Sequence, residues 1–97
     1  MSSHKTFRFR LYVAGNAQNA AQAVANLGNL CREHLAGRHE IEIVDVYLEP
    51  QRALDEGIFL TPTLLKLAPA PSPRRIVGNL SQKLPLMQAL GLDGLAA

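Results

Sequence analysis

The sequence predicts an α/β fold with a mixed sheet and the element order βαβαββα. Residues 7–13 alternate apolar and polar side chains with the two-residue period of a strand. Residues 20–35 repeat apolar side chains at three- and four-residue steps, as an amphipathic helix does, and residues 40–48 (EIEIVDVYL) are rich in β-branched side chains. A strand, a helix and a strand in this order predict a βαβ unit with a right-handed crossover and parallel strands.

Length and composition predict one domain over residues 1–97. A chain of 97 residues with 47% hydrophobic content is long enough for a single core. Its net charge of +2, from ten basic and eight acidic residues, is too small for the basic footprint of a nucleic-acid binder. No apolar run approaches the ~18 residues of a membrane span, and no secretion signal is recognisable. We therefore expect a cytoplasmic protein whose partners are neither nucleic acid nor membrane.

The first half is predicted to contain one long helix between two strands. Asn16 is a candidate N-cap, so the helix should begin near Ala17, and Gly37 should close it. The expected apolar side of this helix comprises Ala20, Val24, Leu27, Leu30, Cys31 and Leu35. The strand over residues 40–48 carries apolar side chains on both faces, and we expect both faces to be covered.

The second half is predicted to contain a short helix, a hairpin and a final helix. Pro50 suits the first turn of a helix that runs to about Gly57. Strands are expected over residues 64–67 and 74–77, joined by the proline-rich segment 68–73. Ser81 is a candidate N-cap for a helix over residues 84–90, and residues 91–97 should fray. This order of elements is a thioredoxin-like layout.

Reactive groups are sparse. Cys31 is the only cysteine, which excludes an internal disulfide and dithiol chemistry, and its place on the apolar helix side predicts a buried residue. Redox-active thioredoxins carry a CxxC pair just after the first strand, where this chain has AGNAQN over residues 14–19. The histidines lack ligand-like spacing, and no glycine-rich phosphate loop occurs. We expect no enzyme, cofactor or metal, and we disfavour the alternative of a thioredoxin-type or glutathione-dependent reductase.

Several ordered strings resemble the KaiB family of circadian clock proteins. They are LYVAGN at 11–16, VDV at 44–46, PQ at 50–51, TPTL at 61–64 and RRIVGNLS at 74–81. The resemblance implies a non-catalytic adaptor that binds a KaiC-type ring ATPase and modulates its phosphorylation and ATPase cycle. Its alternative is a signalling or stress-response module that binds a histidine kinase through the same surface.

The resemblance also implies a homo-oligomer at rest. In the family's resting form, a tetramer, the second half of the chain is rearranged. The pattern of residues 64–90 favours the thioredoxin-like form, while the resting-state fold stays open as an alternative because short apolar runs suit either a strand or a helix.

An apolar pair beside charges of both signs indicates a partner-binding surface. The candidate contacts are Arg52, Glu56, Gly57, Phe59, Leu60, Lys66, Arg74 and Arg75. For Phe59 the alternative is a core residue, and only one of Arg74 and Arg75 should face a given partner because they alternate across a strand. The candidate switch positions are Pro62, Gly78 and Asn79, with Pro62 in the place of the thioredoxin-like cis-proline.

Overall fold

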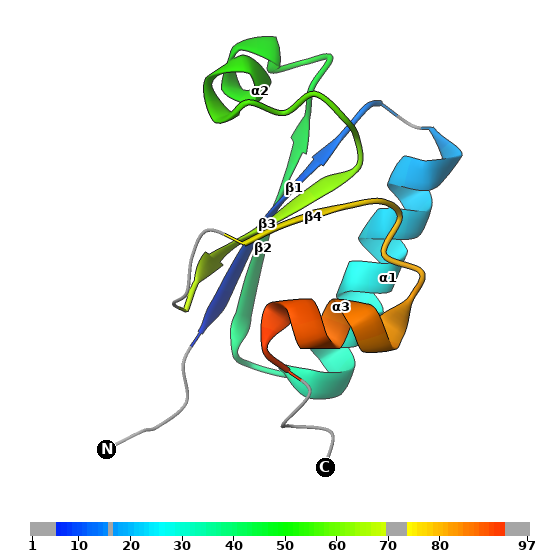
Figure 1. Cartoon of the computed structure of the whole chain (residues 1–97), viewed down its shortest axis with the longest axis vertical. Helices are drawn as coiled ribbons and strands as arrows, with labels where there is room; N and C mark the ends of the chain where they lie inside the picture. The colour runs from blue at the N-terminus through cyan, green and yellow to red at the C-terminus, as the bar shows by residue number, and fades with distance from the viewer. Residues whose placement is uncertain (1–5, 16, 70–73, 93–97) are drawn as a thin grey trace.

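The computed structural model describes residues 6–15, 17–69 and 74–92 and has the predicted order of elements (Figure 1). The elements are β1 (Phe7–Val13), α1 (Gln18–His34), β2 (His39–Asp45), α2 (Pro50–Glu56), β3 (Thr63–Ala68), β4 (Arg74–Val77) and α3 (Lys83–Leu90). The predicted connection over residues 68–73 falls mostly outside the described residues, as does the candidate N-cap Asn16.

The four strands form one mixed sheet in the order β2-β1-β3-β4. β1 pairs in parallel with β2, from Phe7 opposite His39 to Val13 opposite Asp45. β3 runs antiparallel to both β1 and β4, so β3 and β4 form the predicted hairpin. β2 and β4 are therefore the two edges of the sheet.

The side chains of β1 divide between two apolar clusters of unequal size. Phe7, Phe9, Leu11 and Val13 face α1 and α3 and form the larger cluster with them. Tyr12 points the opposite way into a small cluster with Val44, Ala53, Ile58 and Leu65, which lies beneath α2. One face of the sheet is thus covered by two helices, and only one end of the other face is covered, by α2 (Figure 1).

The expectation that both faces of β2 are covered was wrong. Ile43 lies beside Leu11 on the α1 face of the sheet, and it is 43% exposed because β2 is an edge strand that α1 covers only in part. β2 also ends at Asp45, three residues before the predicted end. The Asp45 carboxylate accepts hydrogen bonds from the backbone N–H groups of Gly15 (3.2 Å) and Tyr47 (2.9 Å), which turns the chain away from the sheet.

The limits of α1 also differ from the prediction. Ala17 is its N-cap residue, without a side-chain capping bond, and the helix ends at His34 before a cap at Leu35. Gly37, with φ of +74°, belongs to the turn that leads into β2. Val24 is 41% exposed, and Ala23 takes the buried position in its place. Cys31 is fully buried, as predicted.

The end of the chain is more ordered than the sequence suggested. Gln82, and not Ser81, is the N-cap residue of α3, because the helix begins at Lys83, and Gln82 makes no side-chain capping bond. Beyond α3, Gly91 adopts a left-handed conformation, and the Leu92 N–H donates to the Met87 carbonyl at 2.7 Å. Leu92 is fully buried, so the expected fraying was wrong for residues 91–92, while residues 93–97 lie outside the described part.

Polar contacts tie α2 to the sheet. α2 buries a single side chain of its own, Ala53. Glu42 on β2 accepts from Arg10 of β1 and from Arg52 of α2, each at 2.8 Å. Hydrogen bonds from Arg52 and then Arg10 lower the pKa of the Glu42 carboxyl to about 2. The carboxylate therefore joins the helix to the two strands beneath it.

This network predicts a specific loss of stability in acid. Because the pKa of Glu42 is about 2 when folded against an ordinary 4.5, its contribution is complete above pH 4.5 and disappears as the pH falls toward 2. About half of the side chain is exposed, so solvent screening limits the contribution to about 1 kcal/mol. The free energy of unfolding, measured with urea at pH 7, 4 and 3, should fall less toward pH 3 in Glu42→Gln than in wild type. Glu40→Gln is the control, because Glu40 lies on the same strand and has one exposed arginine partner at 3.4 Å. If the free energy of unfolding fell by the same amount in acid in Glu42→Gln and in wild type, the network would be contradicted.

The buried residue beyond α3 gives a second prediction. Leu92→Ala should lower the free energy of unfolding by about 2 to 4 kcal/mol, because it leaves a cavity in the larger cluster. Leu84→Ala, on the exposed side of α3, should change it by less than about 0.5 kcal/mol. Chemical unfolding followed by circular dichroism measures both. Equal effects of the two changes would mean that Leu92 is not part of the core.

Candidate docking surface

α2 and the loop after it expose large apolar side chains. Phe59 is 85% exposed, Leu54 65% and Leu60 64%. Arg52 and Glu56 lie at intermediate exposure on the same helix. We call Arg52, Leu54, Glu56, Phe59 and Leu60 the docking surface. An exposed apolar centre with charges beside it has the composition of a protein–protein contact.

The backbone after α2 explains why Phe59 points outward. Gly57 adopts a left-handed conformation with φ of +70° and ends the helix. The Ile58 N–H then donates to the Ala53 carbonyl at 2.9 Å, and the Ile58 side chain is buried in the small cluster. The interpretation of Phe59 as a core residue was therefore wrong, because Ile58 occupies the available space.

The far end of this loop is also fixed. The Thr61–Pro62 peptide bond is cis, in the place where a cis-proline was considered. The Thr63 hydroxyl donates to the Leu60 carbonyl at 2.5 Å, and the Gly78 N–H donates to the Pro62 carbonyl at 2.9 Å. Phe59 and Leu60 thus project from a segment held at both ends.

Sequence reasoning missed three exposed apolar residues near α2. Leu54 is one, and Tyr47 (74% exposed) and Leu48 (80%) precede the helix. Leu54 could have been found, since it directly follows Ala53, the buried position of a short helix that covers the sheet with one side only. Tyr47 and Leu48 were assigned to β2, which in fact ends at Asp45.

Lys66 does not belong to the docking surface. It is 3% exposed and faces the larger cluster, because it lies two residues from Leu64 on β3 and so shares its face. Its ammonium lies 5.9 Å from the centre of the Phe7 ring and 3.5 Å from the Leu90 carbonyl oxygen. Burial, and secondarily the charge of Arg74, lower its pKa. The expectation of a partner contact was wrong for Lys66 in this fold.

The two arginines of β4 point to opposite faces. Arg75 lies opposite Leu65 and faces α2, where it donates to the Gly57 carbonyl at 2.9 Å and to the Glu56 carbonyl at 2.8 Å. Arg74 lies opposite Lys66, on the other face. The structure brings Arg75 to the docking surface and leaves Arg74 away from it.

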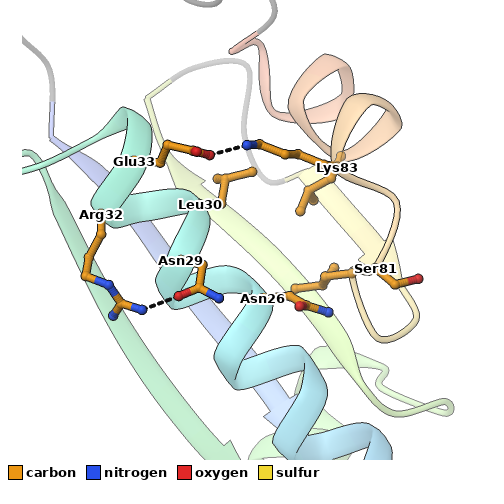
Figure 2. A pocket seen from close by; sticks show the side chains of 9 residues that line it. Asn26, Asn29, Leu30, Arg32, Glu33, Ser81 and Lys83 are labelled. Carbon is orange, nitrogen blue, oxygen red and sulfur yellow. Dashed lines mark hydrogen bonds and ion pairs between the residues drawn. The ribbon is translucent and has the colours of Figure 1, made fainter.

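A groove of about 580 Å³ lies between α1 and α3 (Figure 2). Glu33 and Lys83 form an ion pair that joins the two helices, and at the other end Asn26 donates to the Asn79 carbonyl at 2.8 Å. The Asn79 amide also donates to Gln22 at 2.9 Å. These polar groups are already bound to one another and fix the turn between β4 and α3 to α1. None of the predicted partner residues lines this groove.

The reactive chemistry of the described residues is limited. The first turn of α1 carries no thiol, and burial raises the pKa of the Cys31 thiol to about 11, so it stays protonated at neutral pH. Within residues 6–15, 17–69 and 74–92, no three His, Cys, Asp or Glu side chains gather as metal ligands would. In those same segments no helix has the length and apolar character needed to cross a membrane.

Solved structures with the same fold include thioredoxins and the N-terminal domain of SasA. Chloroplastic thioredoxin z superposes with a TM-score of 0.74 at 17% identity, covering 95% of this chain and 82% of its own. The N-terminal domain of Synechococcus elongatus SasA superposes with a TM-score of 0.72 at 20% identity, covering 94% and 89%. These likenesses confirm the predicted thioredoxin-like fold.

Sequence comparison identifies the family. Circadian clock protein KaiB3 of Synechocystis sp. is 44% identical over 84 residues, which are 87% of this chain and 79% of that protein. The circadian clock oscillator protein KaiB of Synechococcus elongatus is 40% identical over 93 residues, which are 96% and 88%. The model of the KaiB domain matches residues 10–92. With that match over most of its length, and with the fold described above, this chain belongs to the KaiB family.

Proposed function

We propose that this protein is a non-catalytic adaptor that binds a KaiC-type ring ATPase and modulates its phosphorylation and ATPase cycle in a circadian or stress-timing system. The observation that carries the proposal is the exposed Phe59–Leu60 pair, held between α2 and β3 on a scaffold whose only thiol is buried. The two relatives described above, KaiB3 and KaiB, are circadian clock proteins, and this supports a role in timing.

The docking surface suits a binding role. Most of the binding energy at a protein interface comes from a few large side chains near its centre, surrounded by polar residues that exclude water. Phe59 and Leu60 supply such a centre, and Arg52 and Glu56 supply charges of both signs at its edge. The loop is fixed before binding, so little conformational entropy is lost on association.

The position of the thiol argues against an enzyme and supports a cytoplasmic adaptor. A reductase of this fold needs a thiolate at the N-terminus of the first helix, and the cysteine here lies fully buried near the other end of α1. A free buried cysteine also suits the reducing cytoplasm.

A histidine kinase is the second candidate partner. The exposed Phe59–Leu60 pair and the charges beside it would suit a kinase domain as well as a ring. Size-exclusion chromatography of the full chain with a KaiC-type ring and nucleotide, and separately with the kinase, distinguishes the two. Co-elution with the ring supports the main proposal, and co-elution with the kinase alone favours the second.

Phe59→Ala should weaken binding to the ring without unfolding the protein. Loss of a central aromatic side chain at an interface costs about 2 kcal/mol, or about thirtyfold in Kd. Leu84→Ala removes another exposed apolar side chain, on α3, and should leave the affinity unchanged. Titration of the ring with fluorescently labelled protein measures Kd, and circular dichroism checks the fold. Equal affinities of wild type and Phe59→Ala would show that the docking surface does not bind the ring.

We further propose a homo-oligomeric resting form in which the second half is rearranged, with Pro62, Gly78 and Asn79 as the switch positions. Support comes from the turn after β4, where Gly78 has φ of +124° and the non-glycine Leu80 has φ of +65°. This strained turn is held by the hydrogen bonds of Asn79 to Asn26 and Gln22.

The resting form predicts two sets of amide signals. An assigned heteronuclear NMR spectrum should show a second set of amide signals for residues 64–90, and this set should grow with protein concentration. Light scattering on the same samples measures the mass of the oligomer. Asn79→Ala removes the side-chain bond to Gln22 and should enlarge that second set. A single set of signals and a monomeric mass at all concentrations would contradict this form.

A further inference from the structure

α2 has a weak apolar attachment, and at its C-terminal end the Glu56 side chain makes only a long ion pair of 3.9 Å with Arg10 of β1. The helix is seven residues long and buries only Ala53. Glu42 holds its N-terminal half through Arg52. The C-terminal end precedes the loop that carries Phe59 and Leu60, so the direction in which the chain leaves α2 sets the position of both side chains.

Arg75 of β4 binds that end of the helix. Its two terminal nitrogens donate to successive carbonyls, Nη2 to Glu56 at 2.8 Å and Nη1 to Gly57 at 2.9 Å. The last carbonyls of a helix lack partners within the helix and carry partial negative charge. A planar guanidinium can bind two neighbouring oxygens at once, which a lysine ammonium cannot do with the same geometry.

β4 therefore holds the loop from Gly57 to Pro62 at both of its ends. Arg75 binds the carbonyls at the start, and the Gly78 N–H, one residue beyond β4, binds the Pro62 carbonyl at the end. Phe59 and Leu60 lie between these two attachments. Phe59 and Leu60 themselves are largely exposed, while Ile58 before them and Pro62 after them are buried.

We propose that Arg75 is a positioning residue, which holds the Phe59–Leu60 loop in its binding conformation through the Glu56 and Gly57 carbonyls and does not itself bind the partner. This inference rests on the proposed function. It replaces the expectation that Arg75 is a partner contact, because the guanidinium that would meet a partner is already bound within the chain.

The first measurement uses the free protein, so it needs no partner. The Gly57 and Ile58 amides donate to α2 carbonyls, and their hydrogen exchange should accelerate about tenfold in Arg75→Gln. The reason is that the end of the helix opens more often once it has lost the charge-assisted hydrogen bonds of the guanidinium. In Arg75→Lys, the exchange rates of these two amides should lie between those of wild type and Arg75→Gln. Arg74→Gln removes the same charge from the neighbouring residue on the opposite face and should leave these amides unchanged.

The second measurement is affinity for the ring at several salt concentrations. Arg75→Gln should weaken binding about tenfold with the same salt dependence as wild type, because a positioning residue changes the loop and not the charge at the interface. Arg75→Lys should restore part of the affinity.

Two results would overturn the inference. One is unchanged exchange of the Gly57 and Ile58 amides in Arg75→Gln. The other is a loss of affinity accompanied by a weaker salt dependence, which would make Arg75 a direct contact. Failure of the wild-type protein to bind any ring would instead refute the proposed function, and the exchange measurement on the free protein distinguishes the two failures.

Discussion

The alternation of side chains along β1 is the constraint on which the rest of the fold depends. β1 is bonded on both sides, to β2 in parallel and to β3 antiparallel, so its side chains must point alternately to the two faces of the sheet. Its four odd-numbered apolar residues form the base of the larger cluster, and Tyr12 forms the base of the smaller one. A register slip of one residue would exchange the two faces, which strongly fixes the pairing.

The unequal covering of the two faces separates stability from binding. α1 and α3 close one face with a continuous apolar cluster that includes Cys31 and Leu92. The opposite face has only α2, which is tied to the sheet by Glu42, by Arg75 and by the small cluster that contains Ala53. A helix attached in this way can leave its outer side apolar without loss to the core. The docking surface lies on that side.

The local pattern of the sequence was sufficient to predict the helices and strands, whereas the exposure of single side chains depends on the topology of the sheet. Residues 74–77 were predicted as a strand and are β4, because their pattern needs no distant information. The exposure of Ile43 could not be predicted, since it follows from β2 being an edge strand. Lys66 was misplaced because its face depends on which side of the sheet α3 covers. Phe59 and Ile58 are equally apolar, and only the turn at Gly57 decides that Ile58 is the buried one.

The pairing of β3 with β4 connects the sheet to the docking surface. Leu65 belongs to the small cluster beneath α2, and Arg75 lies directly opposite it, so both side chains point toward α2. A shift of β4 by one residue would turn Arg75 to the other face and bring Arg74 toward α2 instead. The two helix carbonyls would then lose Arg75, and the Pro62 carbonyl would lose the Gly78 N–H from its present position. The exposed loop can therefore have its observed shape only while β4 is paired in this register, which makes the docking surface a property of the whole sheet.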